Sequence, residues 1–337
     1  MEDYYQLVIL GSDWDLYKMS YSDIISDKVR YIDGYKPQNQ ILRFAYKAHL
    51  TPKLNRFIHL PFKPLWNKLF FKNIDRNAKV VFLVFQNWLS IDTTIHTIDY
   101  IKKTYKNGKI VLFLQDIVSS FVDIYKNRPV DIFQYKKKCD TIITFDKKDS
   151  KKFGFLYHST VFSHIPVSVS DSNKFDVFFI GKYKGRLDLL VDIDIKLSSC
   201  GLKCKFIVLN APIDKRKMSD KIEYIDHILS YKEVLQLVND TKCILEILQP
   251  GAVGYTYRLW ESISYNKFLL SNNHSLLNSE FFDKKYISIF SSAEDIDMSF
   301  MQRIDKPSYE LNPNSKKISP YNLIEFIELQ LNVKIQL

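Results

Sequence analysis

The chain has 337 residues, more than a single hydrophobic core usually organises, so we expect two domains. Its 46% hydrophobic and 15% aromatic content, with only nine glycines, excludes a disordered or fibrous protein. The formal charge of +10 favours an anionic partner, such as a nucleic acid, an acidic lipid or a phosphorylated substrate. The first residues lack the basic and apolar pattern of a secretory leader, and no stretch approaches the roughly eighteen apolar residues of a membrane span. We therefore expect a cytoplasmic protein.

The first half of the chain alternates strand-like apolar runs with helical patterns. Strands are predicted at residues 6–10, 29–32, 80–85, 110–114 and 141–145. A helix is predicted over 90–105, where Ile95, Ile98 and Ile101 recur at helical spacing, and it should end at Asn107 and Gly108. This alternation is typical of an α/β domain with a parallel sheet.

A second series of strands follows the polar stretch 168–174, which we interpret as a linker. Strands are predicted at 175–180, 205–209, 222–225, 243–248, 267–270 and 286–290. Ser230 and Glu233 have the spacing of a capping box that opens a helix to about residue 239. The predicted domains are 1–165 and 166–337. A final helix over about 320–331 is placed in the second domain, with packing back onto the first domain left open.

The most informative stretch runs from Cys243 to Glu261. It is expected to form a strand, a loop with proline and glycine, and a helix that begins near Gly254. The free backbone N–H groups and the dipole of a helix start suit a phosphate. Thr256 and Arg258 would add a hydroxyl donor and a cation, and Glu261 could accept from both hydroxyls of a ribose. An ordinary strand and helix crossover, whose glycines only permit a turn, is the alternative.

This stretch resembles the donor-binding motif of GT-B glycosyltransferases from bacterial surface-polysaccharide, capsule and lipopolysaccharide biosynthesis. In that family a Gly-x-Thr/Ser-x-Arg-x-x-Glu helix faces the donor. The resemblance implies that the donor diphosphate and ribose are gripped here by Gly254, Tyr255, Thr256, Arg258 and Glu261, with Glu246 as the acidic residue before them. It also implies an α/β fold of two Rossmann-like parallel-sheet domains with a cleft between them. Position 253 is Val253, so the two-glutamate pattern of retaining enzymes is missing, which leaves inversion or retention open.

A basic turn follows the first strand of the second series. Lys182, Lys184 and Arg186 would direct cations at the same diphosphate, with Lys182 and Arg186 stabilising the charge of the leaving group. This arrangement would replace a metal ion, so no metal or cofactor is expected beside the nucleotide-sugar substrate. Three Asp-x-Asp matches, beginning at Asp13, Asp192 and Asp295, lie in the wrong places for a metal-binding donor site. The alternative for the turn is a solvated basic surface.

Two carboxylates of the first domain are candidate general bases for an inverting displacement. Gly11 and Asp13 follow the first strand, at the carboxyl edge where α/β proteins bind ligands. We predict Gly11 as a donor contact and Asp13 as the base, with Asp116 after the strand 110–114 as its rival. Either carboxylate could instead cap a helix.

The segment 34–74 contains no Asp or Glu. It holds Lys36, Arg43, Lys47, Lys53, Arg56, Lys63, Lys68 and Lys72, interleaved with aromatic and aliphatic residues. This pattern favours peripheral contact with an anionic membrane, and acceptor diphosphate, a bland basic surface and nucleic acid are the alternatives. We expect no nucleic-acid partner.

The sequence favours transfer of a sugar from a nucleotide-diphosphate donor to a lipid-linked or growing surface-polysaccharide acceptor, an activity of class EC 2.4. The alternatives are a nucleotide-sugar epimerase of similar fold, or a non-enzymatic nucleotide- or nucleic-acid-binding module.

Overall fold

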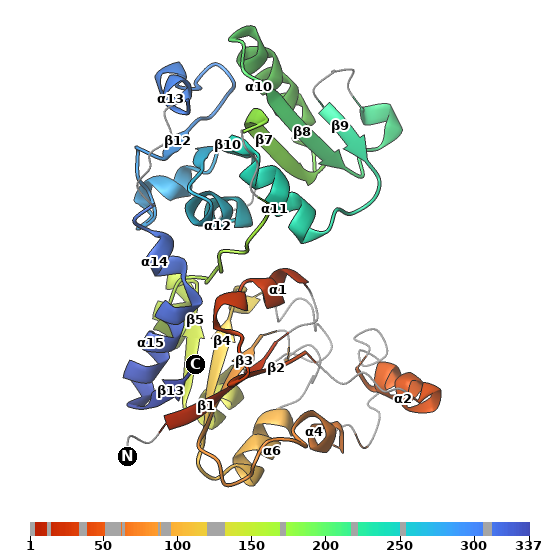
Figure 1. The fold of residues 1–337 in the computed structure, drawn as a ribbon, viewed down its shortest axis with the longest axis vertical. Helices are drawn as coiled ribbons and strands as arrows, with labels where there is room; N and C mark the ends of the chain where they lie inside the picture. The colour runs from red at the N-terminus through yellow and green to blue at the C-terminus, as the bar shows by residue number, and fades with distance from the viewer. Residues whose placement is uncertain are drawn as a thin grey trace. The chain divides into compact units, whose positions relative to one another are not determined.

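A computed structural model gives the fold of the chain. It describes residues 4–11, 15–33, 39–50, 62, 65–86, 88, 96–119, 132–168, 173–216, 222–249, 254–305 and 312–337. The structure divides into two compact units (Figure 1). Unit 1 comprises Met1–Ser163 with Lys317–Leu337, and unit 2 comprises His164–Lys316.

Unit 1 is built on a parallel sheet, sheet A, in the order β13-β1-β3-β4-β5-β6, with β2 also paired to β1. Its strands are β1 (Tyr4–Leu10), β2 (Val29–Ile32), β3 (Val80–Phe85), β4 (Gly108–Leu114), β5 (Thr141–Thr144), β6 (Leu156–Tyr157) and β13 (Lys334–Gln336). The helices are α1 (Asp15–Met19), α2 (Gln40–Leu50), α4 (Leu65–Phe70), α6 (His96–Thr104), α8 (Ile132–Lys138), α9 (Lys147–Phe153) and α15 (Pro320–Leu331), with the short η1 (Ser22–Ile24).

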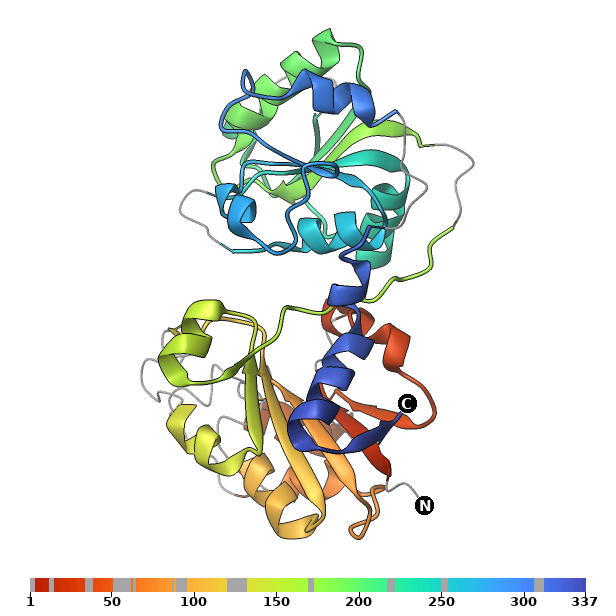
Figure 2. The same ribbon diagram turned by 90° about the vertical axis from the view of Figure 1, so that its left-hand side faces the viewer.

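Both faces of sheet A are covered, as the unbroken apolar runs of its strands require. Side chains alternate along a strand, so Val8 and Leu10 of β1 join one core while Leu7 and Ile9 join another. The first core includes side chains of α4, α6 and α8. The second includes the apolar face of α15, which lies along the sheet in Figure 2.

The last 21 residues belong to unit 1, whereas the sequence analysis placed them in the second domain. The reason is twofold. Leu323, Ile324 and Ile327 of α15 are buried in the core of sheet A. The strand β13 then pairs in parallel with β1, from Tyr4 opposite Lys334 to Gln6 opposite Gln336.

Unit 2 contains a second parallel sheet, sheet B, in the order β12-β11-β10-β7-β8-β9. Its strands are β7 (Phe175–Lys182), β8 (Cys204–Leu209), β9 (Ile222–Ile225), β10 (Thr241–Glu246), β11 (Phe268–Ser271) and β12 (Ile287–Ile289). The helices are α10 (Leu187–Ser199), α11 (Tyr231–Asn239), α12 (Tyr257–Ser264) and α13 (Met298–Arg303), with the short η2 (Ile213–Lys215) and η3 (His274–Asn278); α14 (Ser315–Ile318) spans the junction with unit 1. The predicted α/β class with two Rossmann-like parallel-sheet domains is confirmed.

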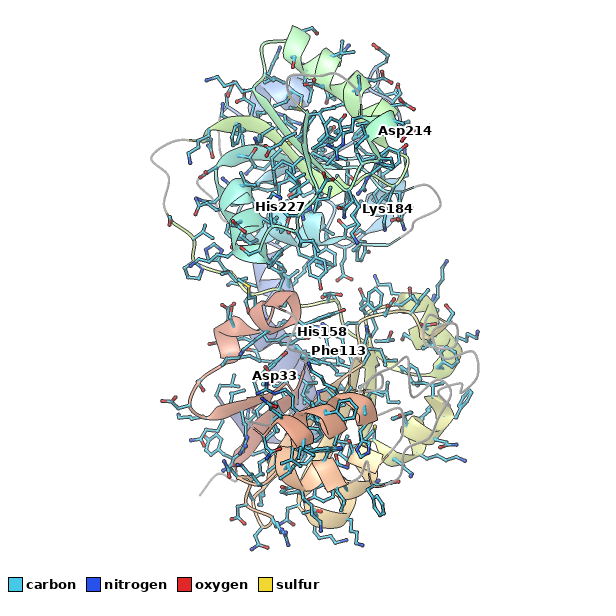
Figure 3. The ribbon with its side chains drawn as sticks, turned by 90° about the vertical axis from the view of Figure 1, so that its right-hand side faces the viewer. Asp33, Phe113, His158, Lys184, Asp214 and His227 are labelled. Carbon is cyan, nitrogen blue, oxygen red and sulfur yellow. The ribbon has the colours of Figure 1, made fainter. Side chains whose placement is uncertain are left out.

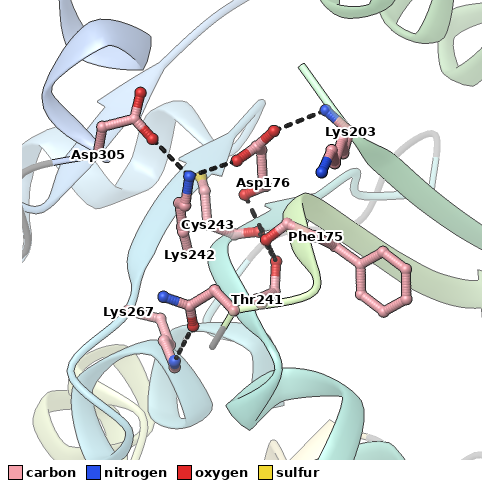
Figure 4. A network of polar contacts seen from close by, with 9 residues as sticks. Phe175, Asp176, Lys203, Thr241, Lys242, Cys243, Lys267 and Asp305 are labelled. Atoms are coloured by element: carbon pink, nitrogen blue, oxygen red, sulfur yellow. Dashed lines mark hydrogen bonds and ion pairs between the residues drawn. The ribbon is translucent and has the colours of Figure 1, made fainter. Parts of the chain in front are cut away.

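The amino edge of sheet B is fixed by a polar network (Figure 4). The ammonium group of Lys242 pairs with Asp176 at 2.6 Å and also with Asp305, and the backbone N–H of Lys203 donates to Asp176 at 2.7 Å. Lys267 donates to the carbonyl of Asn239 at 2.7 Å, and burial lowers its pKa to about 8. These contacts join the start of β7 to the starts of β8 and β10, and the start of β11 to the end of α11.

Within the described residues, no helix combines the length and the apolar character that spanning a bilayer would demand.

Candidate active site

A pocket of about 310 Å³ lies at the carboxyl edge of sheet B. The strand order reverses there, since β7 leads to β8 and β9 on one side while β10 leads to β11 and β12 on the other. Open parallel sheets bind ligands at this kind of switch point. The pocket is lined by Phe179, Ile180, Lys184, Arg186, Leu245, Glu246, Ile247, Leu248, Gln249, Thr256, Tyr257 and Arg258. Three of these residues are cations, and among the described residues no group of His, Cys, Asp and Glu is placed to hold a metal ion.

A tight turn after β7 carries the first cation of the pocket. The backbone N–H of Arg186 donates to the carbonyl of Tyr183 at 3.2 Å, which closes the turn. Its two central residues have left-handed backbones, with φ of 37° at Lys184 and 70° at Gly185. Glycine adopts this conformation without cost, but lysine rarely does. The turn places Lys184, labelled in Figure 3, in the pocket wall.

Hydrogen bonds hold Arg186 between the two central strands, β7 and β10. Its guanidinium donates to the carbonyl of Lys182 from Nε at 3.2 Å and from Nη2 at 3.0 Å, and to the carbonyl of Ile247 from Nη1. The guanidinium also lies over the ring of Phe179, 5.3 Å from its centroid. This packing needs Gly181, because a Cβ there would come within 3.0 Å of the guanidinium. Burial, and then the nearby charge of Arg258, lower the pKa of Arg186.

The helix α12 points its first turn at the pocket. Thr256 is its N-cap, and the threonine hydroxyl accepts from the backbone N–H of Arg258 at 3.1 Å. The helix therefore begins at Tyr257, three residues later than predicted. Gly254 stands before it with φ of 99°, and its carbonyl accepts from the side chain of Asn273 at 2.8 Å.

Glu246, the last residue of β10, is a buried carboxylate in the pocket lining. It is 2% exposed and accepts hydrogen bonds from the hydroxyls of Thr256 and Ser271. Burial raises the pKa of Glu246, while the two hydroxyls and the charge of Arg258 oppose that rise. The carboxylate thus links the end of β10 to the start of α12 and to β11.

Glu261 lies beneath the pocket wall. Its side chain is fully buried, one oxygen forms an ion pair with Arg258, and the other accepts from the hydroxyl of Tyr231 at 3.0 Å. Burial raises the pKa of both Glu261 and Tyr231. The carboxylate therefore orients the guanidinium of Arg258, and the contact of Glu261 with a ribose stays a prediction.

Some of the other residues of unit 2 that were predicted to bind the donor line the pocket, and others do not. Arg186, Glu246, Thr256 and Arg258 line the pocket, and Gly254 precedes them. Lys182 is absent from the lining and its side chain is exposed. The ring of Tyr255 packs edge-on against Trp260 and Phe281, at 5.5 Å and 5.7 Å between centroids.

Two groups that the structure places here were not predicted from the sequence. Gln249 lines the pocket, and the hydroxyl of Ser271 donates to Glu246. Lys184, predicted as a cation of the basic turn, also lines the pocket. No local pattern marks Gln249 or Ser271.

Two predicted residues of unit 1, Gly11 and Asp116, follow strands at the carboxyl edge of sheet A. Gly11 donates its N–H to the carbonyl of Ile32 at 2.9 Å, and the hydroxyl of Tyr31 occupies the space of a Cβ. Asp116 is exposed after β4, and its carboxylate accepts from the N–H of Ile117 at 3.0 Å. Its charge also contributes to the raised pKa of Tyr17, after burial. Asp13 lies outside the described residues.

Several solved structures are similar to this chain. The glycotransferase of kitacinnamycin is 7% identical, with 97% of this chain and 99% of that chain covered and a TM-score of 0.49. TarM is 13% identical over 80% of this chain and 57% of that chain, with a TM-score of 0.48. The UDP-N-acetylglucosamine 2-epimerase from Rickettsia bellii is 14% identical over 98% of both chains, with a TM-score of 0.47.

No protein-family model and no curated protein matches the chain. TM-scores below 0.5 carry no argument about activity, so the chemistry of the site has to be derived from this chain's own residues.

Proposed function

We propose that the chain is a glycosyltransferase of class EC 2.4 that binds a nucleotide-diphosphate sugar in the unit 2 pocket. It would transfer the sugar, without a metal ion, to a lipid-linked or growing surface polysaccharide, as in capsule or lipopolysaccharide synthesis. The acceptor would lie at the cytoplasmic face of a membrane.

The observation that carries the proposal is the pairing of Arg186 and Arg258 on one pocket. Both arginines line the pocket, and burial and then the charge of Arg258 lower the pKa of Arg186. Glu261 offsets the charge of Arg258, whereas the hydrogen bonds of Arg186 go to neutral carbonyl groups, so a further anion in the pocket would be favourable. A diphosphate matches this need, since arginine presents planar, bidentate donors to phosphate oxygens.

The neighbouring groups support the same ligand. Lys184 adds a third positive charge to the lining, and the first turn of α12 directs the positive end of its helix dipole at the pocket. The pocket volume is at the lower end of the range of small-molecule sites. The apolar side chains of Phe179, Ile180 and Leu248 provide walls for the less polar parts of the donor.

The cations also have a role in the reaction. When the bond between sugar and diphosphate breaks, negative charge grows on the leaving diphosphate. Fixed cations directed at that position stabilise the transition state more than the ground state. In this proposal Arg186, already fixed by two carbonyl groups, stabilises that charge, and Asp13 or Asp116 takes the proton of the acceptor hydroxyl.

A transfer assay tests the function. Nucleotide sugars labelled in the sugar are incubated with the protein and a polyprenyl-linked acceptor extract in EDTA, and label in the lipid or polymer fraction is measured. Wild type should transfer label from at least one donor, and Arg258→Lys should transfer far less, because lysine keeps the charge beside Glu261 but loses the planar donor pair. Full transfer by Arg258→Lys and Arg186→Ala would contradict the proposed site. Asp13→Asn and Asp116→Asn, compared in the same assay, identify the base.

The alternative epimerase activity gives a different product. It would convert the donor to an epimer in the absence of any acceptor, and chromatography of the nucleotide sugar alone reveals it.

A further inference from the structure

The helix α2 carries an exposed apolar ridge that its own unit does not cover. Ile41 is 78% exposed and Phe44 is 76% exposed. Residues three apart in a helix lie on the same face, so the two side chains stand next to each other. Leaving two large apolar side chains in water forgoes the free energy of their burial.

The opposite face of α2 is anchored, so the ridge is held outward. The ring of Tyr46 packs edge-on against Trp66 of α4, at 5.1 Å between centroids. The indole N–H of Trp66 donates to Nδ1 of His49 at 2.7 Å. Trp66 is itself part of the core of sheet A. The exposure of Ile41 and Phe44 is therefore a property of a docked helix.

The charged side chains that α2 itself carries are cations. Arg43 and Lys47 are exposed on α2, and the helix contains no acidic residue. The sequence has no Asp or Glu from residue 34 to residue 74. An apolar ridge with flanking cations matches an anionic lipid surface, where side chains enter the interface and cations meet the headgroups.

Other occupants fit these residues less well. A nucleic acid would be held by the cations, but Ile41 offers no ring on which a base could stack. A second copy of the chain, placed face to face, would bring Arg43 and Lys47 of both copies together and repel. The bilayer uses both the apolar side chains and the charges.

We propose that α2 is an interfacial helix that docks unit 1 on an anionic lipid surface, with Ile41 and Phe44 entering the interface and Arg43 and Lys47 meeting the headgroups. The membrane location rests on the proposed function. The test of lipid binding uses neither a donor nor an acceptor, so lipid binding and sugar transfer can be refuted separately.

Cosedimentation with vesicles tests the assignment. Vesicles of phosphatidylcholine alone are compared with vesicles of equal parts phosphatidylcholine and phosphatidylglycerol, using the full chain without nucleotide. Wild type should bind the anionic vesicles and bind less as salt rises. The double variant Ile41→Ser/Phe44→Ser should lower the partition coefficient by about tenfold or more. Arg43→Gln/Lys47→Gln should lose the preference for phosphatidylglycerol.

A matched control removes equally exposed apolar residues from unit 2. Ile213 is 84% exposed and Ile228 is 78% exposed, and Ile213→Ser/Ile228→Ser should bind vesicles like wild type. Equal loss in both double variants, or no loss in Ile41→Ser/Phe44→Ser, overturns the assignment. The assignment is also overturned if the wild-type protein does not bind anionic vesicles but binds an oligonucleotide or forms a dimer through the ridge.

Discussion

Replacing Gly181 with alanine should weaken donor binding while unit 2 stays folded. Gly181 does not have a left-handed backbone, so alanine can adopt its conformation. The new Cβ would lie within 3.0 Å of Nη2 of Arg186, 3.1 Å from Cζ of the same guanidinium and 3.1 Å from Cζ of Phe179. Because the guanidinium is the far end of a flexible side chain, it can move away.

The displaced guanidinium gives up its bonds to the carbonyls of Lys182 and Ile247 and no longer faces the pocket. Losing one charge-assisted contact to a phosphate costs about 1.5 to 3 kcal/mol of binding free energy, which raises the dissociation constant roughly tenfold to a hundredfold. The free energy of unfolding should fall by about 1 kcal/mol, since the clash is relieved without moving backbone.

Calorimetric titration with the nucleoside diphosphate of the donor measures the affinity, and urea unfolding measures the stability. Gly201→Ala is the matched control, because Gly201 has φ of 79° and nothing within 4 Å of a new Cβ. It should lose about 1 kcal/mol of stability to backbone strain and keep its affinity. The double variant Gly181→Ala/Arg186→Ala should bind no more weakly than Arg186→Ala. Unchanged affinity in Gly181→Ala, or additive losses in the double variant, would refute the role given to the guanidinium.

Three further predictions concern the polar groups of unit 2. Burial raises the pKa of Glu246 above its ordinary 4.5, so the folded state holds that proton more tightly than the unfolded state, and stability is lost as the pH rises through the folded pKa. Glutamine cannot ionise, so the unfolding free energy of Glu246→Gln minus that of wild type should grow above about pH 4.5, as urea titrations over a pH series would measure. Glu261→Ala should cost about 3 to 5 kcal/mol because it strands Arg258 in a mostly buried site, whereas Glu223→Ala, at an exposed pair, should cost at most about 1 kcal/mol in the same unfolding experiment. Ser230→Ala should cost about 1 kcal/mol through loss of the capping box of α11, and equal stability to wild type would show that the cap is not formed.

Most strands could be predicted because buried parallel strands are unbroken apolar runs. The residues of β3 are all buried, and its predicted bounds are those observed. The capping box at Ser230 was predicted from two residues, and the structure confirms both of its hydrogen bonds. Such local patterns contain all the information that the element needs.

The roles of the site residues depend on neighbours that are distant in the sequence. The role of Glu261 could not be foreseen, because its partner Tyr231 lies 30 positions away on another helix. Lys182 and Lys184 look equivalent in the sequence, and only the left-handed turn at Lys184 and Gly185 decides which one lines the pocket. The contacts of these residues with a donor stay predictions.

The placement of the final segment shows the same limit. The helix α15 was predicted with its observed bounds, but the sheet against which it packs was not predicted. An amphipathic pattern says that one face is buried, and the partner of that face is a tertiary property.

Calorimetric titration of the wild-type protein with UDP, GDP, dTDP, CDP and ADP, in EDTA, tests the central claim most directly. The arginine pair predicts that at least one of these diphosphates binds, and that Arg186→Ala weakens this binding by about tenfold or more while the protein stays folded. If the folded wild-type protein binds none of them, with or without magnesium, and none of their sugar derivatives, the unit 2 pocket is not a nucleotide-sugar site.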